Sequence, residues 1–334
     1  MTLLRVTPGG WAKPNCGESL QIYFIDVEGG QATLFVSPSG QSMLVDTGWP
    51  GFDRRDARRI VAAAKAAGLK KIDYVVITHY HRDHVGGVPQ LANLIKVGTF
   101  VDHGPNLEDS DVTREDFAAY QNAISHATHL VVKPGDRIPV VGITVDVLAA
   151  AGEHIAGPRV GRSEEDALCA SEPVAPEDAT ENARSLGVLV TYGIFRVLDL
   201  GDLTKKKELE LVCPKNLIGG VDLYVVTHHG SSQSNTRALV DAVHPRVAVM
   251  DNGARKGGSP AAWQTVHESP GLEDLWQLHY SVEGGKDHNV ADPLIANTEA
   301  GEHDSGHWIK VVADRDSTFT VVNARNRYQK SYRK

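Results

Sequence analysis

The sequence has few of the features that mark membrane, secreted and cysteine-ligated metal proteins. It contains no run of about 18 or more apolar residues, so no segment is expected to span a membrane. Its 3 cysteines, Cys16, Cys169 and Cys213, are odd in number and far apart, which fits neither a disulfide framework nor a paired-cysteine metal site. Residues 1–14 lack the long apolar core of a signal peptide. As written, the chain is expected to be cytoplasmic, although an exported protein whose signal peptide had been removed would look the same.

An excess of basic residues is also missing. The 34 lysines and arginines are outnumbered by 42 acidic residues, and the formal net charge is -8. Nucleic-acid binders usually present a basic face, whereas the basic stretches here, 54–59, 205–207 and 325–334, are short. The first lies on a predicted amphipathic helix, where a solvated outer face is the simpler interpretation. A small-molecule substrate is therefore expected and a nucleic-acid substrate is disfavoured, and the sequence indicates no oligomeric state.

What the chain does contain is typical of an α/β protein. Its 41% hydrophobic and 23% charged residues are ordinary for a globular chain, and its 32 glycines suit many tight turns. Short apolar runs alternate with single stretches of helical periodicity. We predict strands at 20–27, 32–36, 42–46, 72–77, 98–102, 130–132, 138–148, 186–191, 195–200, 222–227, 247–250, 308–313 and 318–322, and helices at 54–67, 88–95, 114–127, 205–212, 236–242 and 260–267.

This order predicts two mixed β-sheets packed face to face with helices outside, an α/β protein of the four-layer αββα type. A single domain is expected over 1–334, with its core at about 20–325. Two irregular segments, 151–183 and 278–307, are interpreted as long loops over the site, the first as a substrate lid. The second is rich in histidine and aromatic residues, and a plain surface excursion explains it equally well; none of its histidines is assigned as a metal ligand.

A cluster of histidines and an aspartate directly follows the strand predicted at 72–77. Imidazole nitrogen and carboxylate oxygen are the ligands that zinc and similar ions prefer. Because the cluster lies on a loop beyond a strand end, His79 and His81 can share one ion while Asp83 and His84 reach a second. Adjacent polar groups after a buried strand need a common partner, so the pattern predicts a two-metal centre rather than a coincidental surface cluster.

The pattern H-x-H-x-D-H, followed by two glycines, resembles that of the metallo-β-lactamase superfamily. Three further segments follow in the order of that family: Asp46-Thr47-Gly48, Gly201-Asp202 and Thr227-His228-His229-Gly230-Ser231. The resemblance implies the metallo-β-lactamase fold over about residues 20–250. It also implies that Asp202 bridges both ions and that Asp46, with Thr47, supports the ligands from beneath.

A narrower resemblance points to the branch that contains the DNA-uptake competence nucleases and choline-phosphate esterases. It rests on Phe24-Ile25-Asp26-Val27, on Asn182 and Ser185, and on the H-H-G-S segment, while Glu28-Gly29-Gly30-Gln31 only nearly matches the usual G-Q-G-D. Many relatives carry a histidine where this chain has Asn182. Asn182 is open to weak metal coordination, substrate orientation or turn capping. His103 and His154 are candidate replacement ligands from other loops.

Two histidines compete for the last metal position. His228 is chosen because it directly follows the predicted strand; His229 is the alternative ligand, or else a donor to negative charge developing on the substrate. The predicted metal ligands are therefore His79, His81, Asp83, His84, Asp202 and His228, and the predicted catalytic residues are Asp83, Asp202, His229 and Asn182.

The family resemblance implies a hydrolase that uses two zinc ions to generate a metal-bound hydroxide near neutral pH. Manganese is the alternative metal, since the missing histidine favours a harder ion. The branch resemblance favours a phosphoester or phosphodiester substrate. A lactone or β-lactam hydrolase is the first alternative, and a metal-binding sensor with weak catalysis is the second.

Overall fold

The computed structural model describes residues 18–158, 167–173, 175–299 and 305–334. Cys16 and the segment 1–14, for which no signal peptide is predicted, lie outside the described residues. So do residues 159–166, 174 and 300–304, which belong to the two segments predicted as loops over the site.

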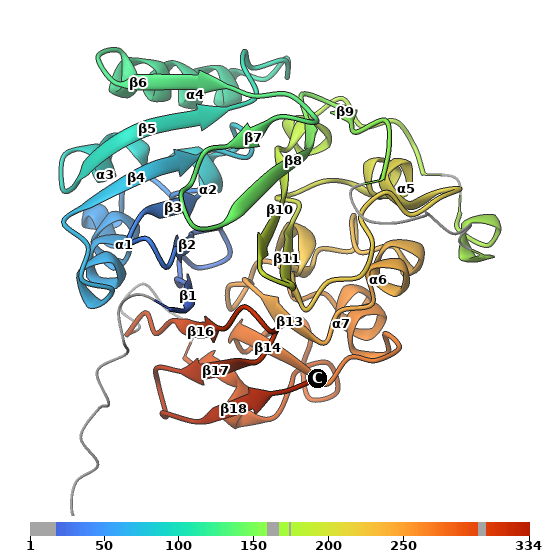
Figure 1. Cartoon of the computed structure of the whole chain (residues 1–334). Helices are drawn as coiled ribbons and strands as arrows, with labels where there is room; N and C mark the ends of the chain where they lie inside the picture. The colour runs from blue at the N-terminus through green and yellow to red at the C-terminus, as the bar shows by residue number, and fades with distance from the viewer. Residues whose placement is uncertain (1–17, 159–166, 174, 300–304) are drawn as a thin grey trace, which may run out of the picture.

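Most of the described strands form two mixed sheets (Figure 1). The first contains β1 (Leu20–Phe24), β2 (Thr33–Val36), β3 (Ser42–Val45), β4 (Lys71–Val76), β5 (Lys96–Asp102), β6 (Thr128–Val131), β16 (Ile309–Ala313), β17 (Phe319–Asn323) and β18 (Gln329–Tyr332). The second contains β7 (Arg137–Ile138), β8 (Thr144–Ala150), β9 (Glu153–His154), β10 (Gly187–Tyr192), β11 (Phe195–Asp199), β12 (Leu223–Val225), β13 (Val247–Met250), β14 (Asp274–His279) and β15 (Ile295–Asn297). The strand orders are β18-β17-β16-β1-β2-β3-β4-β5-β6 and β15-β14-β13-β12-β11-β10-β8-β7, with β9 beside β8.

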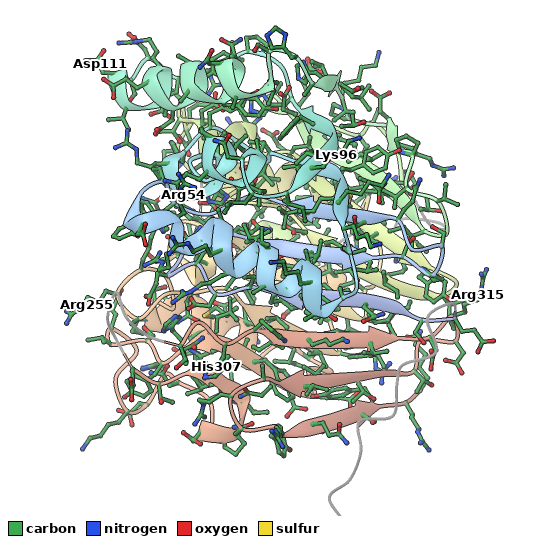
Figure 2. The ribbon with its side chains drawn as sticks, turned by 90° about the vertical axis from the view of Figure 1, so that its left-hand side faces the viewer. Arg54, Lys96, Asp111, Arg255, His307 and Arg315 are labelled. Atoms are coloured by element: carbon green, nitrogen blue, oxygen red, sulfur yellow. A yellow bond between two sulfur atoms is a disulfide. The ribbon has the colours of Figure 1, made fainter. Side chains whose placement is uncertain are left out.

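Helices cover the outer face of each sheet. The α-helices are α1 (Arg55–Ala66), α2 (Arg82–Val85), α3 (Val88–Ala92), α4 (Asp111–Ile124), α5 (Lys205–Val212), α6 (Arg237–Val243) and α7 (Pro260–His267). The short 3-10 helices are η1 (Phe52–Arg54), η2 (Ala167–Ala170), η3 (Glu181–Arg184), η4 (Thr227–Gly230) and η5 (Asp292–Leu294). Figure 2 shows α1 and α4 on the outside of the first sheet, and apolar residues of α5, α6 and α7 pack on the second. Among the described residues, no helix has both the length and the apolar character that a bilayer crossing requires.

The largest apolar cluster fills the space between the sheets. Phe24 and Val76 from the first sheet meet Val190, Val197 and Trp276 from the second, and all five side chains are buried. Burying both inner faces in one cluster holds the sheets together, because apolar surface is removed from water on both sides. The predicted four-layer α/β fold is thereby confirmed. The assignment of 1–334 to a single domain stays a prediction.

The structure has four strands that sequence patterning missed. β9 lies within the segment predicted as a loop at 151–183, and β14 ends and β15 lies within the one predicted at 278–307. β18 lies beyond the predicted end of the core at 325. These strands are short or carry little apolar alternation, so the pattern alone gives a weak signal. Contacts from the rest of the fold hold β18: Tyr332 is buried, donates to Asp274 Oδ2 at 2.6 Å and accepts from Trp276 Nε1 at 3.0 Å.

Cys169 and Cys213 form a disulfide, so the sequence-based exclusion of a disulfide was wrong. The two cysteines are 44 residues apart, and spacing alone gives no reason to pair them. The fold brings η2 against the end of α5, where Cys213 directly follows the helix. The bond therefore anchors part of the segment 151–183 to the second sheet's outer layer.

We expect reduction of this disulfide to lower the free energy of unfolding by about 2–4 kcal/mol, because the bond restricts the unfolded chain. Urea unfolding with and without dithiothreitol measures the difference. The double variant Cys169→Ser/Cys213→Ser is the control and should not respond to the reductant. Equal unfolding midpoints for the oxidised and reduced wild-type chain would contradict the expectation.

Candidate metal centre

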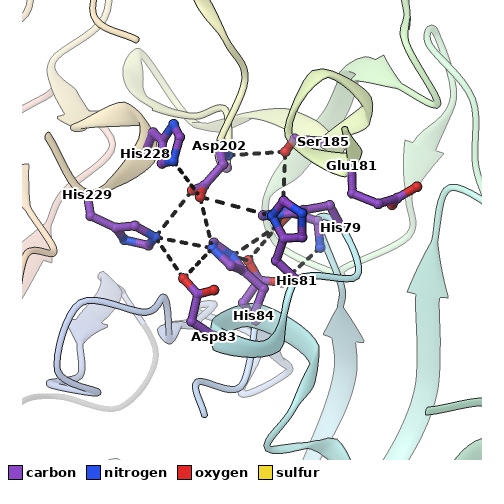
Figure 3. Close-up of polar contacts among 12 residues, drawn as sticks. His79, His81, Asp83, His84, Glu181, Ser185, Asp202, His228 and His229 are labelled. Carbon is purple, nitrogen blue, oxygen red and sulfur yellow. Dashed lines mark hydrogen bonds and ion pairs between the residues drawn. The ribbon is translucent and has the colours of Figure 1, made fainter. Parts of the chain in front are cut away.

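The two sheets bring polar residues together at the carboxyl ends of parallel strands. β3 and β4 are parallel neighbours, and Asp46 follows one while His79 lies just beyond the other. β11 and β12 are parallel neighbours in the second sheet, and Asp202 and His229 follow them. Carboxyl ends of adjacent parallel strands open at one edge of a sheet, where loops can converge. Figure 3 shows the side chains of His79, Asp202 and His229 pointing toward one another.

Asp46 and Thr47 hold the histidine loop from beneath. Asp46 Oδ1 accepts from the Thr78 backbone N–H at 2.8 Å, and Oδ2 accepts from Thr78 Oγ1 at 2.6 Å and lies 2.7 Å from His84 Nδ1. The backbone N–H and hydroxyl of Thr47 both donate to the His84 carbonyl at 2.8 Å. Asp46 and Thr47 therefore contact Thr78 and His84 from the side on which the sequence analysis expects residues that support the ligands.

Close backbone approach explains two glycines of the motifs. A Cβ atom at Gly30 would lie 2.3 Å from the carbonyl oxygen of Asp83, and one at Gly87 would lie 2.1 Å from that of Thr47. No side chain fits at such distances, so glycine is required for the loops to pack. The loop after β1 can therefore lie directly against Asp83.

His79 and His81 turn one ring nitrogen each toward a common point. His79 Nε2 lies 3.1 Å from His81 Nδ1. The outward nitrogens have other partners: His79 Nδ1 lies 3.0 Å from Thr78 Oγ1 and 3.3 Å from Ser185 Oγ, and His81 Nε2 lies 2.9 Å from Glu108 Oε2. These partners fix the orientation of each ring and leave the inward nitrogens available to an ion.

A second group lies next to this pair. One atom each of Asp83, His84, Asp202 and His229 lies within 4.8 Å of all the others, and all four residues are buried. His84 Nε2 is 3.2 Å from Asp83 Oδ2, 3.2 Å from Asp202 Oδ2 and 3.1 Å from His229 Nε2. Asp202 Oδ2 also lies 3.9 Å from His79 Nε2, so its carboxylate lies between the two groups.

The geometry favours His229 over the predicted His228 as the late ligand. His228 Nε2 lies 3.4 Å from Asp202 Oδ2 but is outside the four-residue group, and its Nδ1 faces Ser234 Oγ at 3.2 Å. Both histidines have left-handed backbone, with φ of 56° and 54°, so the chain after β12 does not continue the alternation of a strand. This turn directs His229 inward, and Asp251 Oδ2 lies 3.4 Å behind its Nδ1.

The buried carboxylates favour positive charge at this centre. Burial alone would lower the pKa of His84, but Asp202, Asp83 and Asp46 outweigh it and hold that pKa well above its usual value. Burial also opposes protonation of His229, yet Asp202 raises its pKa to about 10. The pKa of His79 is well below its usual value because of burial and the neighbouring His84 and His81. The low pKa favours the neutral form of His79, which is the form that binds a metal, and a cation bound at His84 and His229 would replace the protons that the carboxylates favour there.

These observations fit a bound metal. Only one of two facing imidazole nitrogens can donate to the other, whereas a cation between them satisfies both lone pairs. The centre also contains carboxylates whose charge a cation would balance. The first group could hold an ion through His79 and His81, the second through Asp83, His84 and His229, with Asp202 shared.

The structure places the remaining candidate ligands elsewhere. Asn182 lies in η3, is buried, and its Oδ1 has no hydrogen-bond partner among the described residues. His103 is buried with Nε2 3.0 Å from Glu181 Oε2, and the half-exposed His154 lies 3.6 Å from Glu210 Oε2. Neither histidine belongs to the group around Asp202 in the described part of the chain.

Three residues at the centre were missed by sequence reasoning. Glu108, from the loop after β5, orients His81, and no motif marks it. Asp251 directly follows β13, so the strand-end signal that found Asp202 could have found it. Lys256 Nζ pairs with Asp83 Oδ2, donates to the Gly29 carbonyl at 2.7 Å and lies 5.3 Å from the centre of the Trp49 ring. Lys256 adds a cation at the edge of the metal centre.

The segment at 278–307 contributes to a separate polar cluster. His279 is buried with Nε2 2.7 Å from Asp26 Oδ1, and Glu28 lies close by. Arg59 Nη1 contacts Asp26 Oδ2 at 2.6 Å, so a guanidinium already supplies positive charge there. This cluster ties β14 to the loop after β1.

A match to a protein-family model, which covers most of the two sheets and the metal centre, identifies the family. Residues 25–250 match the model of the metallo-beta-lactamase superfamily. The chain belongs to that superfamily. Its curated relatives include ComE operon protein 3 of Bacillus subtilis, 24% identical over 56% of this chain and 21% of the relative, and Recombination protein 2 of Haemophilus influenzae, 24% identical over 79% of this chain and 27% of the relative. The chain thus spans about a quarter or less of these two proteins. A UPF0173 protein of Pyrococcus abyssi is 28% identical over 69% of this chain and 84% of its own length.

Among solved structures, this chain is similar to two proteins at low identity. The metallo-beta-lactamase fold protein YhfI of Bacillus subtilis is 13% identical, covers 77% of this chain and 96% of its own, and has a TM-score of 0.46. The diiron beta-hydroxylase CmlA of Streptomyces venezuelae is 16% identical, covers 77% of this chain and 48% of its own, and has a TM-score of 0.41. The predicted superfamily is confirmed by the family match, and membership makes the chain a metallo-hydrolase in class. The likeness to ComE operon protein 3 and Recombination protein 2 agrees with the narrower, competence-type resemblance.

Proposed function

We propose that this superfamily member hydrolyses phosphoesters, phosphodiesters in particular, with two metal ions. The observation that carries the proposal is the shared Asp202, whose carboxylate lies between the pair His79/His81 and the group Asp83/His84/His229. Two ions held side by side stabilise the attacking and the leaving oxygen of a displacement at phosphorus. The likeness to competence-type relatives supports this substrate class.

The metal ions would supply an activated water and polarise the phosphoryl oxygen when bound. Zinc suits the imidazole-rich ligand set, and manganese is the alternative because the first pair has only His79 and His81 as protein nitrogens. Asp46, Glu108 and Asp251 keep the ligand rings in place, each through the nitrogen that faces away from the centre.

Protein groups around the metals suit an anionic substrate. Lys256 presents an ammonium beside Asp83, where it attracts a phosphate. His228, next to Asp202 and with a partly exposed side chain, takes the donor role that sequence analysis gave to His229 as one alternative. In the reaction, the water oxygen bonds to phosphorus, the ester P–O bond breaks, and the leaving oxygen receives a proton to give an alcohol and a phosphate product.

A substrate panel tests the proposal. The chelator-treated protein is reloaded with zinc or with manganese and assayed on bis-p-nitrophenyl phosphate, a lactone, nitrocefin and plasmid DNA. We expect metal-dependent turnover of the phosphodiester and loss of that turnover on chelation. Faster hydrolysis of nitrocefin or of the lactone would overturn the phosphoester assignment. Elemental analysis should give two ions per chain; one or none, without turnover of any substrate, would indicate a sensor.

A further inference from the structure

A cavity of about 430 Å³ is lined in part by residues that follow or precede the metal centre closely in sequence. Residues 175–180 form one wall, and the start of α5 with Ser232 and Gln233 forms another. Three lining residues continue directly from the centre: Asn182 lies one turn before Ser185, Thr204 two residues after Asp202, and Ser232 three residues after His229. A cavity of this size accommodates a small organic ligand.

The start of α5 is unusually cationic for a helix N-terminus. Lys205, Lys206 and Lys207 lie in its first turn together with the buried Glu208, and no side chain caps it. The helix dipole already places partial positive charge there, so lysines in the first turn are unfavourable unless an anion balances them. Lys206 pairs with Glu177, and Lys207 Nζ lies 2.8 Å from Glu210 Oε2. Lys205 is exposed and forms no ion pair with the described residues.

Two buried polar side chains in the cavity also lack partners. Thr204 is 8% exposed and Asn182 is 9% exposed, and both line the cavity. Thr204 Oγ1 and Asn182 Oδ1 have no hydrogen-bond partner among the described residues. Buried polar atoms are normally satisfied, so these side chains indicate a ligand that brings hydrogen-bonding oxygens. The Thr204 hydroxyl can donate to such an oxygen, whereas Asn182 Oδ1 is an acceptor and needs a donor on the ligand, such as a hydroxyl.

The opposite wall carries two acidic residues. Glu177 pairs with Lys206, while Asp178 Oδ1 accepts from the backbone N–H of Thr180 at 2.8 Å and keeps its charge. An anion is therefore attracted locally, by Lys205 and the N-terminus of α5, and not by a net positive charge of the whole cavity.

We propose that this cavity binds a second phosphate of the substrate. The substrate class is then a small phosphodiester, such as a nucleotide unit, that carries a further phosphate group one sugar away from the bond that is cleaved. This inference rests on the proposed phosphodiesterase function and specifies its substrate. It assigns substrate positioning to Thr204, Lys205 and the N-terminus of α5, which face residues 175–180 across the cavity.

A matched pair of chromogenic substrates tests it. Thymidine 5′-(p-nitrophenyl phosphate) is compared with its 3′-phosphorylated form on the metal-loaded protein. We expect a KM about 10-fold lower for the phosphorylated form with the wild-type chain, and loss of most of that preference in Lys205→Glu and in Thr204→Val. Lys215→Glu, at an exposed lysine that does not line the cavity, should keep it. Equal KM values for both substrates with the wild-type chain, or a full preference in both cavity variants, would overturn the proposal.

A binding measurement separates this proposal from the catalytic one. Calorimetric titration of the chelator-treated protein with pyrophosphate should show binding that Lys205→Glu weakens by about 10-fold and Lys215→Glu does not change. If pyrophosphate binds in this way but no phosphodiester is turned over, the anion site is supported and the proposed phosphodiesterase activity is rejected. If the protein turns over phosphodiesters but shows neither the substrate preference nor pyrophosphate binding, the anion site is rejected and the proposed phosphodiesterase activity stands.

Discussion

Asp202→Asn should lower kcat for phosphodiester hydrolysis by about 1,000-fold, since a shared ligand of two ions supports several kcal/mol of transition-state stabilisation. Asp202 Oδ2 lies 3.9 Å from His79 Nε2 and 3.2 Å from His84 Nε2, so one carboxylate faces both groups of ligands. An asparagine keeps the shape but removes the charge and one acceptor. We therefore also expect fewer bound ions per chain, measured by elemental analysis of the purified variant.

The fold should survive this change, because Asp202 follows β11 and contributes no apolar surface to the core. Thermal unfolding should stay close to the wild type. Asp241→Asn is the matched control: it removes a carboxylate that pairs with Arg237 on the surface of α6, and full activity is expected. His81→Ala should lose turnover to a similar extent. Turnover at wild-type level in both Asp202→Asn and His81→Ala would reject the mechanism.

Local sequence order explains why much of the centre could be predicted. His79 and His81 lie on the loop after β4, and Asp83 and His84 lie in the short helix α2 that follows at once, so their proximity follows from the chain itself. Asp46 and Asp202 directly follow apolar strands, and parallel pairing brings such strand ends to one edge. Periodicity likewise identified most helices and strands, since each buries one face or both.

Other features depend on contacts between distant segments, which periodicity does not encode. The turn that directs His229 rather than His228 inward needs left-handed backbone at two consecutive non-glycine residues, and the rest of the fold enforces it. The pairing of Cys169 with Cys213 depends on where η2 packs. Glu108 and Lys256 reach the centre from loops without any motif. Chemistry that lies on one loop is therefore readable from sequence, whereas orientation and long-range pairing are not.

Asp46→Asn should weaken metal affinity by about 10- to 100-fold, the range typical of residues that orient metal ligands. Asp46 Oδ2 lies 2.7 Å from His84 Nδ1 and fixes the nitrogen that faces away from the centre. An asparagine in that buried position must turn an N–H group toward one of the donors that the carboxylate now accepts from, so His84 loses its fixed orientation. Titration with zinc in a chelator buffer measures the change.

The effect of Asp46→Asn should differ in kind from that of Asp202→Asn. Asp46 touches no other member of the group around Asp202 except through His84, so saturating zinc should restore most of kcat, whereas it should not rescue Asp202→Asn. Asp251→Asn is a graded comparison, because Asp251 Oδ2 lies 3.4 Å from His229 Nδ1, a longer contact than that of Asp46. We expect a smaller loss of affinity there. A loss of kcat in Asp46→Asn that persists at saturating zinc would show that Asp46 takes part in the reaction itself rather than in holding His84.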